Sequence, residues 1–193
     1  MQNEQDLQKY LELILKELEA HKQISTHASF KDLILQKQTY ELQNAHPNPL
    51  NKFGKKCFSQ TDEDGITLEI VRRLGIKNGF YAEFGVGNGL ENNTLILAAL
   101  GWNGFWVGGE DLAFNYAGSK KFKYIKEWIM LDNISRLAQL GSAAFPGSLL
   151  DVISLDLDGN DIFFVKNLLQ NAFLPKLFIV EYNSKSPPLL NFK

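Results

Sequence analysis

A glycine-rich loop between a short strand and a helix is the feature that most constrains this fold. Residues 80–84 form an apolar run, and residues 85–89 read Gly-Val-Gly-Asn-Gly. Glycine allows positive φ angles and close approach of the backbone to a ligand, and the N-terminus of a following helix presents free N–H groups. Nucleotide-binding α/β folds carry such a loop after their first strand. We therefore expect Gly85, Gly87 and Gly89 to contact a cofactor.

The rest of the chain alternates between apolar runs and amphipathic stretches. The pattern predicts helices over residues 62–74, 90–100, 133–140 and 161–171, and strands over residues 80–84, 104–107, 124–130, 151–157 and 176–182. Strands that alternate with helices form parallel sheets, because each crossover helix returns the chain to the same edge. The expected fold class is therefore α/β, a Rossmann-like parallel sheet with helices on both faces.

The first part of the chain has a different composition. Residues 1–50 form a predicted helical extension, and residues 51–193 form the α/β domain. Four apolar positions follow one helical stripe, namely Leu7, Leu11, Ile14 and Leu18. The stripe fails at His21 and Ser25, and a second helix is predicted over residues 30–44. Because two heptads are few for a coiled coil, we interpret the stripe as a helix packed on the domain. A dimerising coiled coil is the alternative, so a homodimer stays open.

Charge and cysteine content exclude several classes of function. The formal net charge is −2, so no basic excess tracks a phosphate backbone, and we expect no nucleic acid partner. Cys57 is the one cysteine, which excludes an intramolecular disulfide. The sequence shows no signal peptide and no apolar run of membrane-spanning length, which predicts a cytoplasmic protein. No Ser-His-Asp arrangement can be identified in the sequence, so hydrolase chemistry has no support.

Acidic residues near the glycine loop indicate which nucleotide it binds. Glu110 follows the second predicted strand, where an acid commonly binds ribose hydroxyls, and Asp132 is placed for an adenine or ribose contact. NAD-binding proteins use the spacing G-x-G-x-x-G, with two residues between the second and the last glycine, whereas one residue, Asn88, separates Gly87 from Gly89 here. Glu83 ends the first strand, where it would repel a pyrophosphate but attract the ammonium of S-adenosylmethionine (SAM). SAM is therefore favoured, and a nicotinamide-dependent oxidoreductase is the less favoured alternative.

A second acidic cluster follows the fourth and fifth strands. Its members are Asp156, Asp158, Asp161, Glu181 and Asn183. Oxygen ligands suit Mg²⁺ or another divalent cation, which predicts a metal site at Asp156, Asp158, Glu181 and Asn183. Alternatively, one of the carboxylates Asp156, Asp158 and Glu181 is the catalytic base that takes the proton of an acceptor hydroxyl. Turn chemistry explains Asp158 equally well, and Asp161 is best interpreted as an acid at a helix start.

Several segments together resemble the FkbM-like SAM-dependent methyltransferases. The similar segments are residues 58–65, 81–94, 101–110, 153–161 and 180–183. The resemblance implies a Rossmann-like methyltransferase fold and O-methylation, often of sugars in polysaccharide or natural-product pathways. It also suggests that Gln60, Glu63 and Asp64 help to close the cofactor or acceptor site. The alternative for these three residues is an ordinary helix N-terminus.

The end of the chain departs from this family. Methyltransferase domains of this type continue past the fifth strand through a further helix and two more strands, for which 193 residues leave no room. The sequence therefore supports two functions. The first is a methyltransferase that modifies a saccharide or other small hydroxyl acceptor. The second is a catalytically incomplete binding module with a methyltransferase-like fold.

Overall fold

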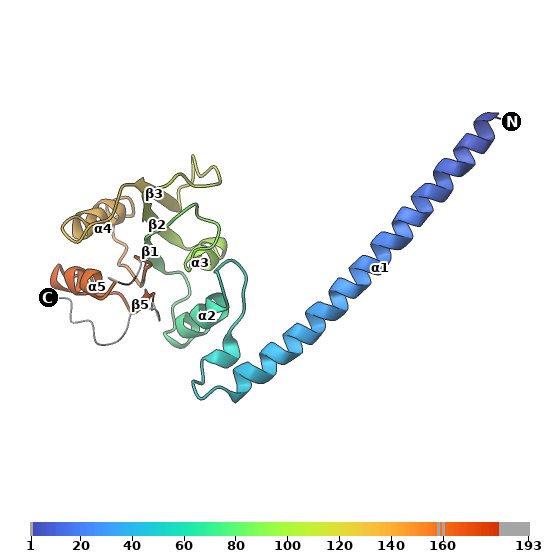
Figure 1. The fold of residues 1–193 in the computed structure, drawn as a ribbon. Coiled ribbons are helices and arrows are strands. Elements are labelled where there is room, and N and C mark those ends of the chain that lie inside the picture. Colours follow the sequence, from blue (N-terminus) through green and yellow to red (C-terminus); the bar gives the residue numbers. More distant parts are fainter. Residues whose placement is uncertain (1, 158, 160, 182–193) are drawn as a thin grey trace. The chain divides into compact units, whose positions relative to one another are not determined.

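The chain divides into two compact units, Met1–Lys52 and Phe53–Lys193, in a computed structural model that describes residues 2–157, 159 and 161–181. Figure 1 shows the elements in chain order: α1 (Gln2–Ala45), η1 (Asn51–Phe53), α2 (Glu63–Arg73), β1 (Phe80–Phe84), α3 (Leu95–Ala99), β2 (Asn103–Gly108), β3 (Phe122–Lys126), α4 (Ile134–Ser142), β4 (Val152–Leu155), α5 (Asp161–Gln170) and β5 (Leu177–Val180).

Helix α1 is continuous, so the predicted interruption after the first stripe is wrong. Its 44 residues give a length of about 66 Å. The hydroxyl of Thr26 donates to the Lys22 carbonyl at 2.8 Å, and that of Ser29 donates to the Ser25 carbonyl at 2.9 Å. Hydroxyl groups that bond back in this way are tolerated within a helix, which is why these polar residues do not end it.

No helix in the described part of the chain is long and apolar enough to span a bilayer.

The second unit is built on a parallel five-stranded sheet with the order β3-β2-β1-β4-β5. This confirms the predicted Rossmann-like α/β fold. The chain moves outward from β1 through β2 to β3 and then returns to place β4 on the other side of β1. Ligands of such sheets bind beyond the carboxyl ends of the strands, at the point where the strand order reverses. Here that point lies between β1 and β4.

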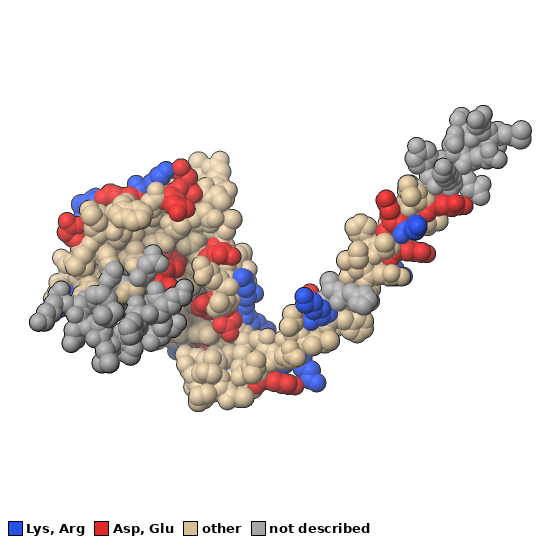
Figure 2. Space-filling model, viewed as in Figure 1, with Lys and Arg blue, Asp and Glu red and all other residues tan. Residues whose placement is uncertain are grey.

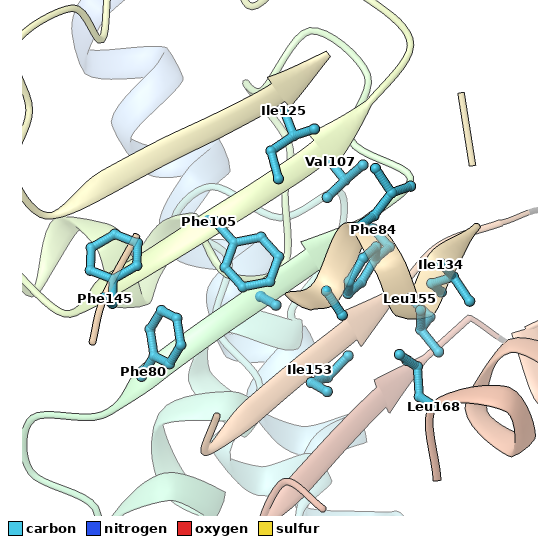
Figure 3. Close-up of a cluster of buried hydrophobic side chains, with 13 residues drawn as sticks. Phe80, Phe84, Phe105, Val107, Ile125, Ile134, Phe145, Ile153, Leu155 and Leu168 are labelled. Atoms are coloured by element: carbon cyan, nitrogen blue, oxygen red, sulfur yellow. The ribbon is translucent and has the colours of Figure 1, made fainter. Parts of the chain in front are cut away.

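Alternation along the strands sends side chains to two cores. One core lies under α4 and α5 and includes the residues labelled in Figure 3: Phe80, Phe84, Phe105, Val107, Ile125, Ile134, Phe145, Ile153, Leu155 and Leu168. The other core lies under α2 and α3 and includes Val71, Tyr81, Leu97, Trp106 and Val152. Successive residues of a strand face opposite sides of the sheet, so both faces require helices, as predicted.

Most element boundaries differ from the predicted ones by a few residues, and two of the larger differences have local reasons. The helix expected from residue 90 begins at Leu95, because the Glu83 carboxylate accepts hydrogen bonds from the N–H groups of Asn93 and Thr94. The strand expected to reach residue 130 ends at Lys126. Beyond it, the Asn133 side chain binds the backbone of the connecting segment and replaces sheet hydrogen bonds there.

Candidate functional site

A cavity of about 360 Å³ opens at the carboxyl edge of the sheet, beside the switch point between β1 and β4. Its wall consists of Gly85, Val86, Gly87, Gly108, Gly109, Glu110, Trp128, Ile129, Asp156, Leu157 and Phe164. These residues come from the segments that follow four different strands and from α5. The volume lies in the range of small-molecule and cofactor sites.

The three predicted glycines have three different surroundings. Gly85 has a φ of +94°, and an added Cβ would lie 1.8 Å from the carbonyl oxygen of Asp156. Gly89 has a φ of +84°, and an added Cβ would lie 2.9 Å from side-chain atoms of Leu112 and Phe114. Gly87 faces the cavity, since its nearest neighbour would be Glu110 Oε2 at 3.9 Å. Gly85 and Gly87 line the cavity, whereas Gly89 packs under the neighbouring loop.

Glu83 is a buried acceptor for the segment that leads into α3. Its side chain is 1% exposed, and it accepts hydrogen bonds from Asn93 N at 3.0 Å, from Thr94 N at 3.0 Å and from Thr94 Oγ1 at 2.5 Å. Trp106 Nε1 in turn donates to Thr94 Oγ1 at 2.8 Å. Burial raises the pKa of the Glu83 carboxyl above its ordinary value, although these hydrogen bonds act in the opposite direction. Glu83 thus fixes the backbone at the start of α3 and is not part of the described cavity wall, although the sequence predicted that it points into the site.

The structure separates the other two predicted nucleotide contacts. Glu110 lies on the cavity wall, and its carbonyl accepts a hydrogen bond from the Tyr124 hydroxyl at 2.5 Å. Its position is the predicted one, and a ribose contact stays a prediction. Asp132 is exposed in the turn before α4 and does not belong to the described wall. An adenine contact of Asp132 therefore has no support from its position.

Sequence reasoning missed the apolar side of the cavity. Trp128 is 74% exposed, and its ring lies so close to Gly109 that an added Cβ there would be 2.7 Å from Trp128 Cε3. Asn133 fixes this segment, since its Nδ2 donates to the Trp128 carbonyl at 3.0 Å and its Oδ1 accepts from Met130 N at 2.8 Å. Ile129 and Phe164 complete the apolar wall. The predicted third strand runs to residue 130 and therefore places Trp128 inside the sheet. An aromatic residue just after a shorter third strand is the sequence signal that indicates this wall of the cavity.

Asp156 and Glu181 meet at the ends of β4 and β5. The N–H of Asp156 binds the Phe84 carbonyl at 3.0 Å, and the N–H of Glu181 binds the Leu155 carbonyl at 3.1 Å, so backbone bonds hold both residues beside the sheet. Burial is the largest cause that raises the pKa of Asp156, to about 6, and the charge and hydrogen bond of Glu181 come next. Burial and the neighbouring Glu181 carboxylate therefore both disfavour the charged form of Asp156.

The predicted metal site is only partly within the described residues. Asp158 and Asn183 lie outside them, which leaves Asp156 and Glu181. Within the residues described, no three His, Cys, Asp or Glu side chains are grouped so that they could hold a metal ion. The metal site therefore stays a prediction, of which the structure describes Asp156 and Glu181.

Asp161 has the helix-start role that the sequence indicated. Its side chain is almost fully buried, and it accepts hydrogen bonds from Leu157 N at 2.9 Å and Gly159 N at 3.1 Å. Asp161 therefore fixes the turn between β4 and α5, which carries Asp156 and Leu157 to the cavity. It acts on the site through the backbone.

The acids before β1 also serve local structure. Asp64 is fully buried, and its Oδ2 accepts hydrogen bonds from the three backbone N–H groups of residues 57–59. Glu63 accepts a hydrogen bond from Thr61 N at 3.0 Å. Neither acid belongs to the described cavity wall, and Gln60 does not belong to it either. The observed contacts are those of a loop fastened to the N-terminus of α2.

Comparisons of the chain with protein-family models, with curated proteins and with solved structures found no match. The fold and the site by themselves define the class of protein. It is a Rossmann-like α/β protein with a ligand-sized cavity at the switch point of its sheet.

The effect of Glu181 on the pKa of Asp156 gives a testable prediction. In a ¹³C NMR titration of the side-chain carboxyls, Asp156 is expected to titrate with an apparent pKa of about 6. Glu181→Gln removes the neighbouring negative charge, so the apparent pKa of Asp156 should fall toward its ordinary value. Glu110→Gln, on the other side of the cavity, should leave that pKa unchanged. An unchanged Asp156 pKa in Glu181→Gln would show that the two groups are independent.

Proposed function

We propose that this chain binds SAM in the cavity and is a SAM-dependent methyltransferase. The observation that carries the proposal is the charge of the wall, since its described residues include two carboxylates, Glu110 and Asp156, and no lysine or arginine. SAM carries a sulfonium and an ammonium, which such a wall attracts. A dinucleotide carries a pyrophosphate, which the same wall repels. The charge therefore favours SAM over NAD.

The wall also offers suitable partners for each part of the cofactor. The open backbone at Gly87 gives the amino acid portion close access to the glycine loop. The Glu110 carboxylate suits ribose hydroxyls, because hydrogen bonds to charged groups are stronger than those between neutral groups. Trp128, Ile129 and Phe164 provide an apolar surface for the adenine ring. In this proposal Glu83 contributes indirectly, by fixing the start of α3 after the glycine loop.

Methyl transfer needs positioning and one proton acceptor. The acceptor hydroxyl oxygen forms a bond to the methyl carbon while the bond from that carbon to sulfur breaks, which leaves S-adenosylhomocysteine. The hydroxyl proton passes to Asp156, which lines the cavity and is mostly deprotonated above pH 6. The resemblance to FkbM-like enzymes suggests a saccharide or another small hydroxyl compound as acceptor. A divalent cation remains a hypothesis, to be tested by adding a chelator to the assay.

A fluorescence titration with S-adenosylhomocysteine and SAM tests the cofactor site. Trp128 is exposed at the cavity, whereas Trp102 and Trp106 are buried, so a bound ligand should change the emission of Trp128. Glu110→Ala is expected to weaken binding by about tenfold or more, because it removes a charged hydrogen-bond acceptor. Asp111→Ala is the matched control, because this neighbouring acid is exposed and pairs with Lys126 instead.

Each other outcome of the titration has a definite meaning. Tighter binding of NAD than of SAM would contradict the proposal and support an oxidoreductase. No binding by a folded protein would also contradict it. SAM binding without transfer to any hydroxyl acceptor in a broad sugar screen would favour the binding module. Trp128→Phe removes the reporter, so calorimetry on this variant separates a lost signal from lost affinity.

A further inference from the structure

The continuity of α1 extends one heptad register along most of the helix. Counting in steps of four and three from Ile14 places eight described positions on one seam: Ile14, Leu18, His21, Ser25, Asp32, Leu35, Thr39 and Leu42. Apolar residues occupy both ends of this seam, and their side chains are exposed on the helix. Apolar seams of this period are buried by pairing with another helix. The polar residues in the middle decide which pairing is possible.

A parallel pair of α1 helices would be unfavourable at the centre. In a parallel, in-register coiled coil, each seam residue faces the same residue of the partner helix. Asp32 would then meet Asp32 of the second copy, and His21 would meet His21 of the second copy. Two carboxylates that face each other within a seam repel strongly, because the local dielectric is low.

An antiparallel pair resolves this conflict. Two kinds of position alternate along the seam, and in an antiparallel pair each kind faces the other kind on the second helix. In one such register the numbers of facing residues add up to 53, so residue 18 faces residue 35, residue 21 faces residue 32, and residue 14 faces residue 39. His21 then meets Asp32 of the second copy, and Leu18 meets Leu35 of the second copy. Each of these pairs occurs twice in a two-fold dimer. The register therefore places the His21 imidazole beside a carboxylate near the centre, leucine against leucine in the next layer outward, and Ile14 against Thr39 beyond that layer.

The residues that flank the seam agree with this arrangement. The positively charged side chains of α1 are lysines, and lysines and acidic side chains both occur along the helix (Figure 2). In the antiparallel register Glu17 lies beside Gln38 of the second copy, and Lys22 lies beside Ser29 of the second copy. No two like charges meet among these flanking positions. Leu13, Leu33 and Ile34 lie off the seam and take no part in this pairing.

We propose that α1 pairs with α1 of a second copy of this chain as an antiparallel coiled coil, with His21 of each copy beside Asp32 of the other. The proposal concerns assembly and does not depend on the function of the cavity. The dimerising coiled coil was the less favoured alternative when the sequence indicated only two heptads. The uninterrupted helix extends the same register as far as Leu42, so more heptads are available for pairing.

Sedimentation equilibrium of the full chain tests the pairing. The wild type is expected to be a dimer, and Leu18→Asp should weaken the dimer by about a hundredfold or more, because two buried leucines are lost per dimer. Leu13→Asp is the matched control, since Leu13 is 55% exposed and Leu18 is 60% exposed on the same helix, but Leu13 lies off the seam. A monomeric wild type, or equal effects of the two variants, would overturn the proposal.

A charge exchange tests the direction of the pair. His21→Glu places two acids together in the antiparallel register and should weaken the dimer by at least tenfold. The double variant His21→Glu with Asp32→Lys should restore it, because each glutamate then meets a lysine of the second copy. In a parallel pair the double variant would instead set glutamate against glutamate and lysine against lysine. Failure of the double variant to restore the dimer, or no effect of His21→Glu, would overturn the proposed arrangement.

Discussion

Gly85→Ala is expected to lower the free energy of unfolding by more than about 3 kcal/mol. The added Cβ would lie 1.8 Å from the carbonyl oxygen of Asp156, which is backbone and cannot rotate away, and the φ of +94° disfavours any residue with a side chain. The loop and the end of β4 would have to separate. Urea denaturation followed by circular dichroism measures the loss, and a variant too unstable to purify would agree with the same expectation.

Gly87→Ala is the control for this prediction. Its Cβ would have no neighbour closer than 3.9 Å, so the free energy of unfolding should change by less than about 1 kcal/mol. The methyl group would instead enter the cavity, so SAM binding should weaken if the cofactor lies against the loop as proposed. Equal losses of stability in the two variants would contradict the distinction between a glycine required for packing and a glycine that leaves room for a ligand.

Glu83→Ala is expected to cost about 3–5 kcal/mol of stability, the second large effect. The buried carboxylate accepts hydrogen bonds from Asn93 N and from both the N–H and the hydroxyl of Thr94. Its removal leaves these donors without their partner in a site that excludes water. The beginning of α3 depends on these bonds, because Asn93 and Thr94 directly precede it. The same denaturation experiment measures the effect.

Two further variants show whether the carboxylate itself is required. Glu83→Gln keeps the volume but turns an NH₂ group toward donors, and it should still cost about 1–3 kcal/mol. Glu91→Ala removes an exposed acid from the same loop and should change stability by less than about 0.5 kcal/mol. If Glu83→Gln were as stable as the wild type, the buried group would act as a neutral space filler rather than as an acceptor.

The regular part of the fold follows from local patterns in the sequence. Strand β1 was predicted at its observed bounds, because Phe80, Ala82 and Phe84 alternate with residues that face the opposite core. The glycine loop and Glu110 were placed correctly at the carboxyl edge for the same reason. Parallel strands bring the ends of separate segments together at one edge of the sheet. The order of helices and strands along the chain is enough to predict this arrangement.

The parts that the sequence did not predict depend on side chains meeting across the fold. Glu83 was expected to face a ligand, but its partners are backbone N–H groups ten and eleven residues further on, which no periodicity reveals. Trp128 reaches the cavity because Asn133 fixes the segment after β3. Asp132 was predicted as a contact from its place after the third strand, but it is exposed and does not belong to the described wall.

The position of β1 in the sheet has a consequence for how the protein is made. One edge of β1 pairs with β2 soon after it in the chain, but the other edge pairs with β4, and Phe80 N binds Asp151 Oδ2, which is 71 residues away. Pairings this distant close slowly, because a long loop must first be ordered. Asp156, against which Gly85 rests, follows β4. A growing chain on the ribosome therefore contains the entire glycine loop well before it can form the cavity that the loop lines.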